Sequence, residues 1–185
     1  SPCSRDSASL DCCVADEGSE MAFEIPADLN PALVGLAWLR GRWEGTGYRQ
    51  WPGLEKHSYA LQVDFADNGE DYLHYLCQAF ETDDDGAPTK PLFMETGFWR
   101  PLADGTVDVM MCSPDGFAEI WFGKVQPGRL DLITDAVART RDAKVAYTAG
   151  RRLYGNVGGR LLFSFDRATE DEELQPYIWA QLERA

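Results

Sequence analysis

Short apolar runs separated by tight turns make up most of this sequence. The runs are rich in Val, Ile, Tyr, Phe and Trp, the composition of β-strands. Most breaks between them contain Asp-Gly, Asn-Gly or Pro-Gly, dipeptides that favour tight turns. We therefore predict ten strands, at residues 42–51, 57–65, 72–80, 93–100, 107–113, 117–125, 130–138, 145–154, 160–165 and 175–184.

The order of these runs predicts a closed sheet. No helical pattern lies between them, and consecutive strands joined by tight turns must pair antiparallel. An open meander of this size would leave two exposed edges, which closure removes. The predicted fold class is therefore all-β, a ten-stranded antiparallel meander β-barrel with one short N-terminal helix. Such a barrel is wider than the roughly eight strands whose side chains fill the interior, so we expect a cavity or a wide mouth.

Closure requires the last predicted strand to pair with the first, which explains why the end of the chain stays apolar. In this strand, alternation places Leu174, Ile178 and Leu182 on one face and Tyr177 and Trp179 on the other. Both faces carry apolar side chains, so alternation alone leaves open which one points inward.

The helix is predicted at residues 30–41. Asn30 can cap it, Pro31 suits its first position, and Gly41 follows its end. Upstream, residues 1–22 are rich in Ser, Asp and Cys without periodicity, which predicts a disordered acidic leader before a barrel domain at 23–185.

Composition narrows the class of partner. The net charge of −14 disfavours nucleic acid, whose binding requires Lys and Arg against phosphate; we interpret the acidity as favouring solubility. The longest apolar run, residues 31–39, is about half of the roughly 18 residues that a membrane helix needs, so we predict no membrane association. The sequence does not indicate an oligomeric state.

Cysteine and histidine are both sparse. An odd number of cysteines, three of them in the leader, is not a disulfide framework and predicts reduced thiols in a cytoplasmic protein. The cysteines are Cys3, Cys12, Cys13, Cys77 and Cys112. With only His57 and His74, a three-histidine metal site is excluded and little remains for a Ser-His-Asp triad.

Three glycines mark the first predicted strand. Gly41, Gly45 and Gly47 alternate around Trp43, and glycine on a strand face costs stability unless the sheet bends or something approaches the backbone closely. One interpretation is a barrel corner with Trp43 plugging the base. The other is room for a flat ligand beside the strand.

The pattern Gly41-x-Trp43-x-Gly45-x-Gly47 resembles the GxWxGxG signature of the nitrobindins, a family of lipocalin-like barrels earlier described as fatty-acid-binding-protein-like. The resemblance extends over about residues 29–184, and its segments follow one another in the same order as in the family. Its further segments are 94–100, 113–123, 137–154 and 174–184. It implies a ten-stranded barrel carrying b-type haem in a cleft at its mouth, where ferric haem isomerises peroxynitrite to nitrate and a histidine of the last strand holds the iron.

The chain departs from this family at one residue. The family's closing motif resembles Q-P-H-L-x-A-x-L-x-R, whereas this chain reads QPYIWAQLER, with Tyr177 in the place of the histidine. Phenol must lose its proton to bind iron strongly, unlike imidazole. Three alternatives follow for Tyr177. It is a packing residue in a barrel without haem, or it binds ferric haem as tyrosinate. In the third, another residue replaces it as iron ligand, with His74 and His57 as candidates, or the cleft takes a different cofactor.

Five basic residues gather in the predicted hairpin at 130–154. They form either a solvated strand face or a set of partners for haem propionates. The set comprises Arg139, Arg141, Lys144, Arg151 and Arg152.

We therefore expect a nitrobindin-like barrel that binds an apolar or flat small molecule, with Tyr177 and Lys144 as ligand contacts and with no cofactor and no catalytic residue. The alternative is a ferric haem b protein with Tyr177 as metal ligand, acting as a peroxynitrite isomerase. A third hypothesis, an interaction module using the barrel exterior or the leader, has no dedicated motif.

Overall fold

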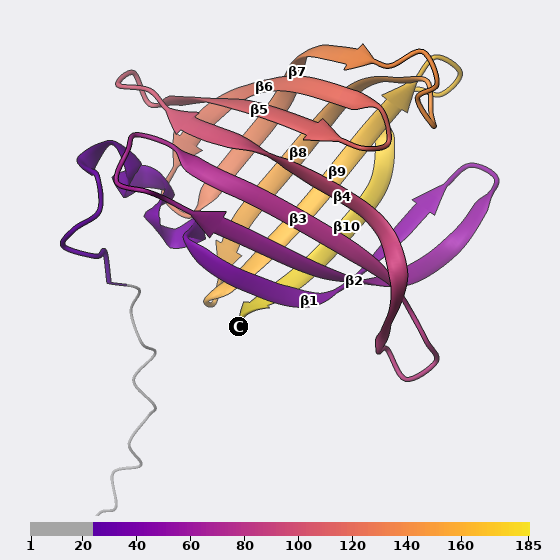
Figure 1. Ribbon diagram of the computed structural model, residues 1–185, viewed down its shortest axis with the longest axis horizontal. Helices are drawn as coiled ribbons and strands as arrows, with labels where there is room; N and C mark the ends of the chain where they lie inside the picture. Colours follow the sequence, from indigo (N-terminus) through magenta and orange to yellow (C-terminus); the bar gives the residue numbers. More distant parts are fainter. Residues whose placement is uncertain (1–23) are drawn as a thin grey trace, which may run out of the picture.

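The barrel predicted from the turn pattern is present in the computed structural model, which describes residues 24–185. Ten antiparallel strands close in the order β1-β10-β9-β8-β7-β6-β5-β4-β3-β2 (Figure 1). The strands are β1 Gly41–Trp51, β2 Leu54–Ala66, β3 Leu73–Thr82, β4 Pro88–Pro101, β5 Thr106–Ser113, β6 Phe117–Gln126, β7 Arg129–Arg139, β8 Tyr147–Val157, β9 Arg160–Thr169 and β10 Gln175–Arg184. The predicted leader at 1–22, with three of the cysteines, lies outside the described residues.

All ten predicted strands are confirmed, and the differences lie at their ends. The largest is in β4, which begins at Pro88, because Thr82 of β3 still pairs with Pro88. Residues 88–91 are exposed and show no alternation of buried and exposed side chains. The sequence pattern therefore did not predict this first part of β4.

Closure occurs where β1 meets β10. A Cβ at Gly45 would lie 2.2 Å from the Gln181 carbonyl oxygen, and one at Gly47 would lie 2.1 Å from that of Trp179. The glycines therefore admit the backbone of β10 against β1, which agrees with the barrel-corner interpretation of the motif. Trp43 is buried, and its indole N–H donates to the Leu39 carbonyl at 2.8 Å.

A short helix covers one end of the barrel. This 3-10 helix, η1 Pro31–Leu39, is capped by Asn30, whose side chain accepts from the Ala32 amide at 3.0 Å as predicted. The Asn30 amide also bonds the carbonyl of Gly69 in the β2–β3 turn, and Arg184 of β10 donates to the carbonyl of Trp38. The opposite end, where β1–β2, β3–β4, β5–β6, β7–β8 and β9–β10 turn, is the mouth (Figure 1).

Strands β7 and β8 stop pairing with each other before they reach the mouth. The two strands pair only from Arg129↔Gly155 to Ile133↔Arg151, and beyond this point β7 pairs with β6 alone. Thr134 still links the sides, because its hydroxyl accepts from the Gly150 amide at 3.0 Å.

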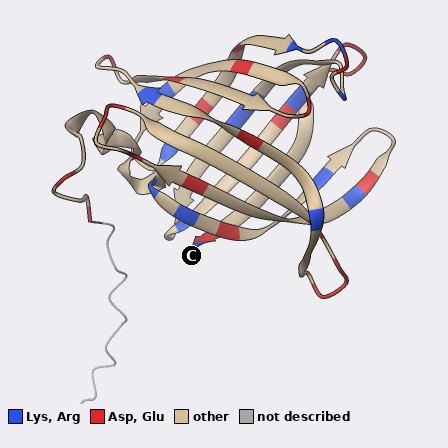
Figure 2. Cartoon of the chain, viewed as in Figure 1, with Lys and Arg blue, Asp and Glu red and all other residues tan. Residues whose placement is uncertain are grey.

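Charge is concentrated outside the barrel. Acidic residues gather in the hairpin turns, including the β3–β4 turn with Asp83, Asp84 and Asp85 (Figure 2). Within residues 24–185, no helix has the length and apolar character needed to cross a membrane.

Candidate functional site

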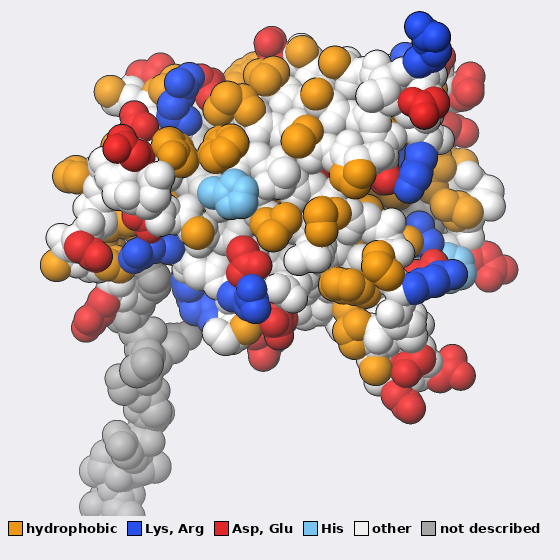
Figure 3. Space-filling model, in the orientation of Figure 1, with side chains coloured by type: hydrophobic (Ala, Val, Ile, Leu, Met, Phe, Trp, Pro, Cys, Tyr) orange, Lys and Arg blue, Asp and Glu red, His pale blue; other side chains and the backbone are white. Residues whose placement is uncertain are grey.

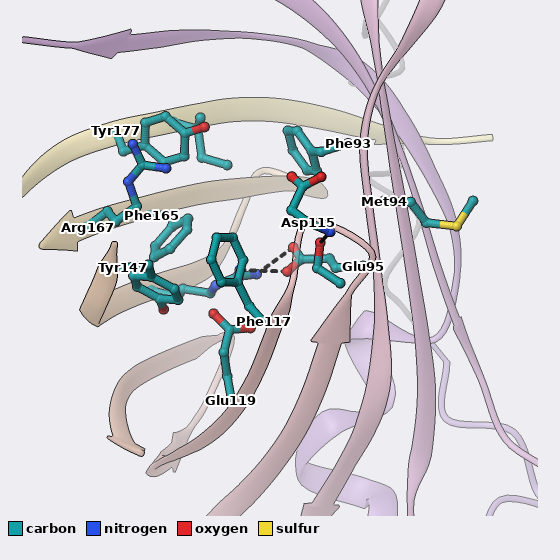
Figure 4. A pocket seen from close by; sticks show the side chains of 13 residues that line it. Phe93, Met94, Glu95, Asp115, Phe117, Glu119, Tyr147, Phe165, Arg167 and Tyr177 are labelled. Atoms are coloured by element: carbon teal, nitrogen blue, oxygen red, sulfur yellow. Dashed lines mark hydrogen bonds and ion pairs between the residues drawn. The ribbon is translucent and has the colours of Figure 1, made fainter. Parts of the chain in front are cut away.

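A cavity opens inside the mouth end of the barrel. Its volume is about 60 Å³, room for about four to six water molecules. Its walls come from β4, β6, β8, β9 and β10 and from the turn after β5 (Figure 4). They consist of Phe93, Met94, Glu95, Ser113, Asp115, Phe117, Glu119, Tyr147, Arg152, Phe165, Arg167, Tyr177 and Ile178.

A fully buried ion pair lies at the inner side of this cavity. Arg152 of β8 donates from both terminal nitrogens to the two carboxylate oxygens of Glu95 on β4, at 2.8 and 2.7 Å. The Tyr75 hydroxyl donates to the same carboxylate at 3.1 Å, and Arg152 also donates to the Tyr154 hydroxyl at 3.2 Å. This bidentate geometry offsets the desolvation cost of burying the two charges.

Glu119 of β6 is a second buried carboxylate, with 4% of its surface exposed. Burial raises its pKa, which the charge of Arg152 opposes and that of Glu95 reinforces. Burial also raises the pKa of Tyr147, with the charge of Glu119 adding to the effect. Burial therefore shifts the equilibrium of both groups toward the protonated, uncharged form.

Tyr177 enters the cavity because β10 bulges at this residue. Pro176 pairs with Asp166 and Ile178 with Phe165, which leaves Tyr177 as the extra residue in the ladder. Ile178, which follows the bulge, faces the interior, yet Tyr177 also lines the cavity. A bulge redirects a side chain in this way.

The predicted sharing of one face by Tyr177 and Trp179 is therefore wrong, since a strict alternation does not anticipate an inserted residue. Trp179 packs beside Tyr48, a residue exposed on the outer surface.

Arg167 packs against the ring of Tyr177 (Figure 4). Its guanidinium carbon lies 3.8 Å from the Tyr177 ring centroid and 4.3 Å from that of Trp51. The edge of Tyr177 also packs on Trp51 and Phe165, with centroids 5.6 and 5.8 Å apart. Arg167 is only 7% exposed, and burial lowers its pKa, although Tyr177 acts in the opposite direction.

The other predicted ligand contact, Lys144, lies in the β7–β8 loop. It forms an ion pair of 2.7 Å with Asp115, which lines the cavity, but its own side chain is 67% exposed. Lys144 therefore reaches the cavity only through Asp115.

The structure divides the basic cluster of the β7–β8 hairpin. Arg139 pairs with Glu170 and Arg151 with Asp131 at the surface, and Arg141 is exposed. Arg152 is the buried member of this cluster, so the solvated strand face is wrong for this residue. Buried and exposed side chains alternate along β8, and Arg152 occupies one of the positions that point inward.

The candidate substitute iron donors lie elsewhere. His57 and His74 are exposed, and the Nε2 of His74 lies 2.9 Å from the Thr96 hydroxyl oxygen. Figure 3 shows histidine side chains on the outer surface. Cys77 is buried and Cys112 exposed, both as free thiols. Residues 24–185 contain no cluster of His, Cys, Asp and Glu arranged to hold a metal ion.

Sequence reasoning did not single out Glu95, Glu119 and Arg167 as site residues, yet the sequence carries a signal for each. Each stands two residues from an aromatic side chain that faces the interior: Trp121 follows Glu119, and Phe165 precedes Arg167. Continuing the period of two from these aromatics places the charged residues inside.

A porphyrin does not fit this cavity. The available space corresponds to a few waters, whereas a porphyrin has four linked pyrrole rings. None of the lining residues is a histidine, and the Tyr177 ring is packed between Arg167, Trp51 and Phe165. The cavity is therefore too small for the haem that the nitrobindin resemblance implies, and its lining lacks the imidazole that would bind the iron.

A closed ten-stranded antiparallel barrel with a cavity of aromatic and charged side chains at its mouth is an architecture typical of β-barrels that bind small molecules. Comparison with known proteins narrows this class. The sequence model described as "THAP4-like, heme-binding beta-barrel domain" matches residues 32–184, and the chain belongs to this nitrobindin family. The family resemblance drawn from the sequence is confirmed.

Individual relatives cover nearly all of the barrel. The chain is 55% identical over 166 residues to a ferric nitrobindin-like protein of Cutibacterium acnes, covering 89% of this chain and 100% of the relative. It is 42% identical over 164 residues to a peroxynitrite isomerase of Nocardioides sp., covering 89% and 99%. The crystal structure of Rv2717c from M. tuberculosis aligns with a TM-score of 0.76 and 30% identity, covering 85% of this chain and 99% of that one.

Proposed function

We propose that this chain is a nitrobindin-family barrel that binds a small apolar or flat molecule at its mouth and does not hold haem iron. One observation carries the proposal: Tyr177, at the position of the iron-ligating histidine implied by the resemblance, packs against Arg167 in a cavity of about 60 Å³. Peroxynitrite isomerisation by ferric haem is then absent. A cytoplasmic location remains our prediction from the cysteines.

The aromatic walls support binding of a flat group. Phe93, Phe117 and Phe165 line the cavity beside Tyr147 and Tyr177. Rings of this kind bury large apolar areas and pack edge-on or offset against one another and against a bound ring. A small flat ligand can therefore replace water between them.

A second candidate function is a ferric haem protein with tyrosinate as ligand. The guanidinium of Arg167 against the Tyr177 ring favours it, since tyrosinate ligation needs a nearby cation. The 42% identity to a relative named peroxynitrite isomerase also favours it. This candidate requires the mouth to widen enough for a porphyrin.

A titration with hemin distinguishes the two candidates. We expect the parent protein to show no saturable Soret band at one equivalent, and Tyr177→Phe to behave in the same way. A saturable band in the parent that disappears in Tyr177→Phe would contradict the proposal and establish the tyrosinate protein.

Tyr177→His then separates the ligand from the space around it. Imidazole binds iron without losing a proton, so a Soret band gained in this variant would show that only the donor is missing. A variant that stays colourless would show that the cavity itself excludes the porphyrin. Either result agrees with the proposal.

A further inference from the structure

Arg167 is the cation of the cavity without a carboxylate partner. The lining contains two cations, Arg152 and Arg167. Arg152 is held by both oxygens of Glu95. Among residues 24–185 no acidic side chain forms an ion pair with Arg167, and its buried Nε–H has no hydrogen-bond acceptor. A guanidinium that is 7% exposed and lacks a counterion is costly in a folded protein.

The acidic residues of the cavity do not cancel this charge. Glu95 is neutralised by Arg152, and Asp115 by Lys144 at 2.7 Å. Glu119, the third carboxylate of the lining, forms no ion pair with Arg167 in the described part of the chain. Arg167 is therefore a buried cation that no carboxylate of the cavity neutralises directly, in a chain whose net charge is −14.

The position of the guanidinium is fixed before any ligand binds. Its carbon lies 4.3 Å from the Trp51 ring centroid and 3.8 Å from the Tyr177 ring centroid, at the corner between two nearly perpendicular rings. These cation–π contacts position the guanidinium, whose fork of N–H donors suits a planar anion. A carboxylate accepts two such N–H bonds in the same plane.

From this geometry we propose that Arg167 binds the carboxylate of a small aromatic acid whose single ring occupies the cavity between Phe93, Phe117 and Phe165. The inference rests on the proposed function and adds the chemical class of its ligand. The space for about four to six waters suits one ring rather than several. The partly polar lining near Glu119 and Tyr147 leaves room for a polar substituent on the ring.

The test compares benzoate with benzamide, its neutral analogue of nearly equal shape, by ligand-observed NMR titration of the full chain. A charged hydrogen-bonded pair in a buried site is worth about tenfold or more in affinity. We expect benzoate to bind the parent protein at least about tenfold more tightly than benzamide. Arg167→Met should abolish this difference by weakening benzoate alone, and Arg167→Lys should keep part of it.

The control is Arg151→Met, which removes an exposed arginine that does not line the cavity and should change neither affinity. Circular dichroism and thermal unfolding verify that each variant is folded; if Arg167→Met is not, Arg167→Lys carries the comparison. Equal affinities of benzoate and benzamide, unchanged in the Arg167 variants, would overturn the inference while leaving the proposed function intact. Failure of both probes to bind would overturn the two together.

Discussion

Glu95, Arg152 and Glu119 form a layer of buried ionisable side chains inside an otherwise aromatic barrel, and each can be tested as a single residue. Within this layer, the ion pair of Glu95 and Arg152 joins β4 to β8 through side chains rather than through the backbone ladder. Breaking a buried pair by removing one partner leaves an uncompensated charge, whereas replacing both partners by apolar residues can be nearly neutral. The layer therefore predicts strongly coupled mutations.

Glu95→Leu and Arg152→Met should each lower the free energy of unfolding by about 3–5 kcal/mol. The double variant should be destabilised by much less than the sum, because no charge remains buried alone. Urea denaturation of all four proteins measures this double-mutant cycle. Additive single effects would show that the pair is not coupled.

Glu119 predicts a pH dependence with a definite sign. Its pKa is raised above the ordinary 4.5, so its contribution to stability is complete below that value and is lost as pH rises through the folded-state pKa. The charges facing it are Arg152 and Glu95, with the Tyr147 phenol beside them. Relative to Glu119→Gln, the parent protein should therefore lose stability as pH rises above 4.5.

Chemical denaturation at a series of pH values measures the difference between the parent and Glu119→Gln, so that other titrating groups cancel. Glu55→Gln, at an exposed position of β2, is the matched substitution outside the cavity, measured in the same way. A Glu119→Gln difference that is independent of pH would contradict the raised pKa.

At the scale of elements, the seam between β1 and β10 decides whether the barrel closes. Gly45 and Gly47 admit the carbonyls of β10 at distances that no Cβ can tolerate. Gly45→Ala and Gly47→Ala should each destabilise the fold by about 1–3 kcal/mol or more, since the seam must separate.

Gly155→Ala in β8 is the control for this seam, because no atom lies within 4 Å of its added Cβ. Its effect should stay within about 0.5 kcal/mol. Thermal unfolding monitored by circular dichroism provides the comparison. Equal melting temperatures for the seam variants and the parent would show that the glycines are not required for closure.

The elements also show which information the sequence contains. Turn dipeptides and apolar runs predict all ten strands because hairpin geometry is local, and closure follows because an open meander of ten strands would leave two exposed edges. Pro176 beside the bulge at Tyr177 is typical of a bulge because it cannot donate to the ladder, but which side chain the bulge redirects depends on how β10 fits against β9. The ion pair between Glu95 and Arg152 joins residues 57 positions apart, and its partners follow from barrel register rather than from either segment alone.

At the scale of the whole molecule, one end of the barrel is covered by η1, and the cavity lies inside the opposite end (Figure 1). Much of the acidic charge lies on the turns (Figure 2), and the cavity contains one cation, Arg167, without a carboxylate partner among the described residues. This arrangement separates a repulsive exterior from an anion-attracting interior. It favours small, singly charged ligands that fit the mouth over extended polyanions.

We propose that this member of a haem-binding family binds no haem and that Tyr177 is not an iron ligand. The most direct test is the visible absorbance spectrum of the full chain purified from cells supplied with excess haem precursor. We expect protein without a Soret band, indistinguishable from Tyr177→Phe prepared in parallel. A Soret band at one haem per chain that is absent from Tyr177→Phe would contradict it.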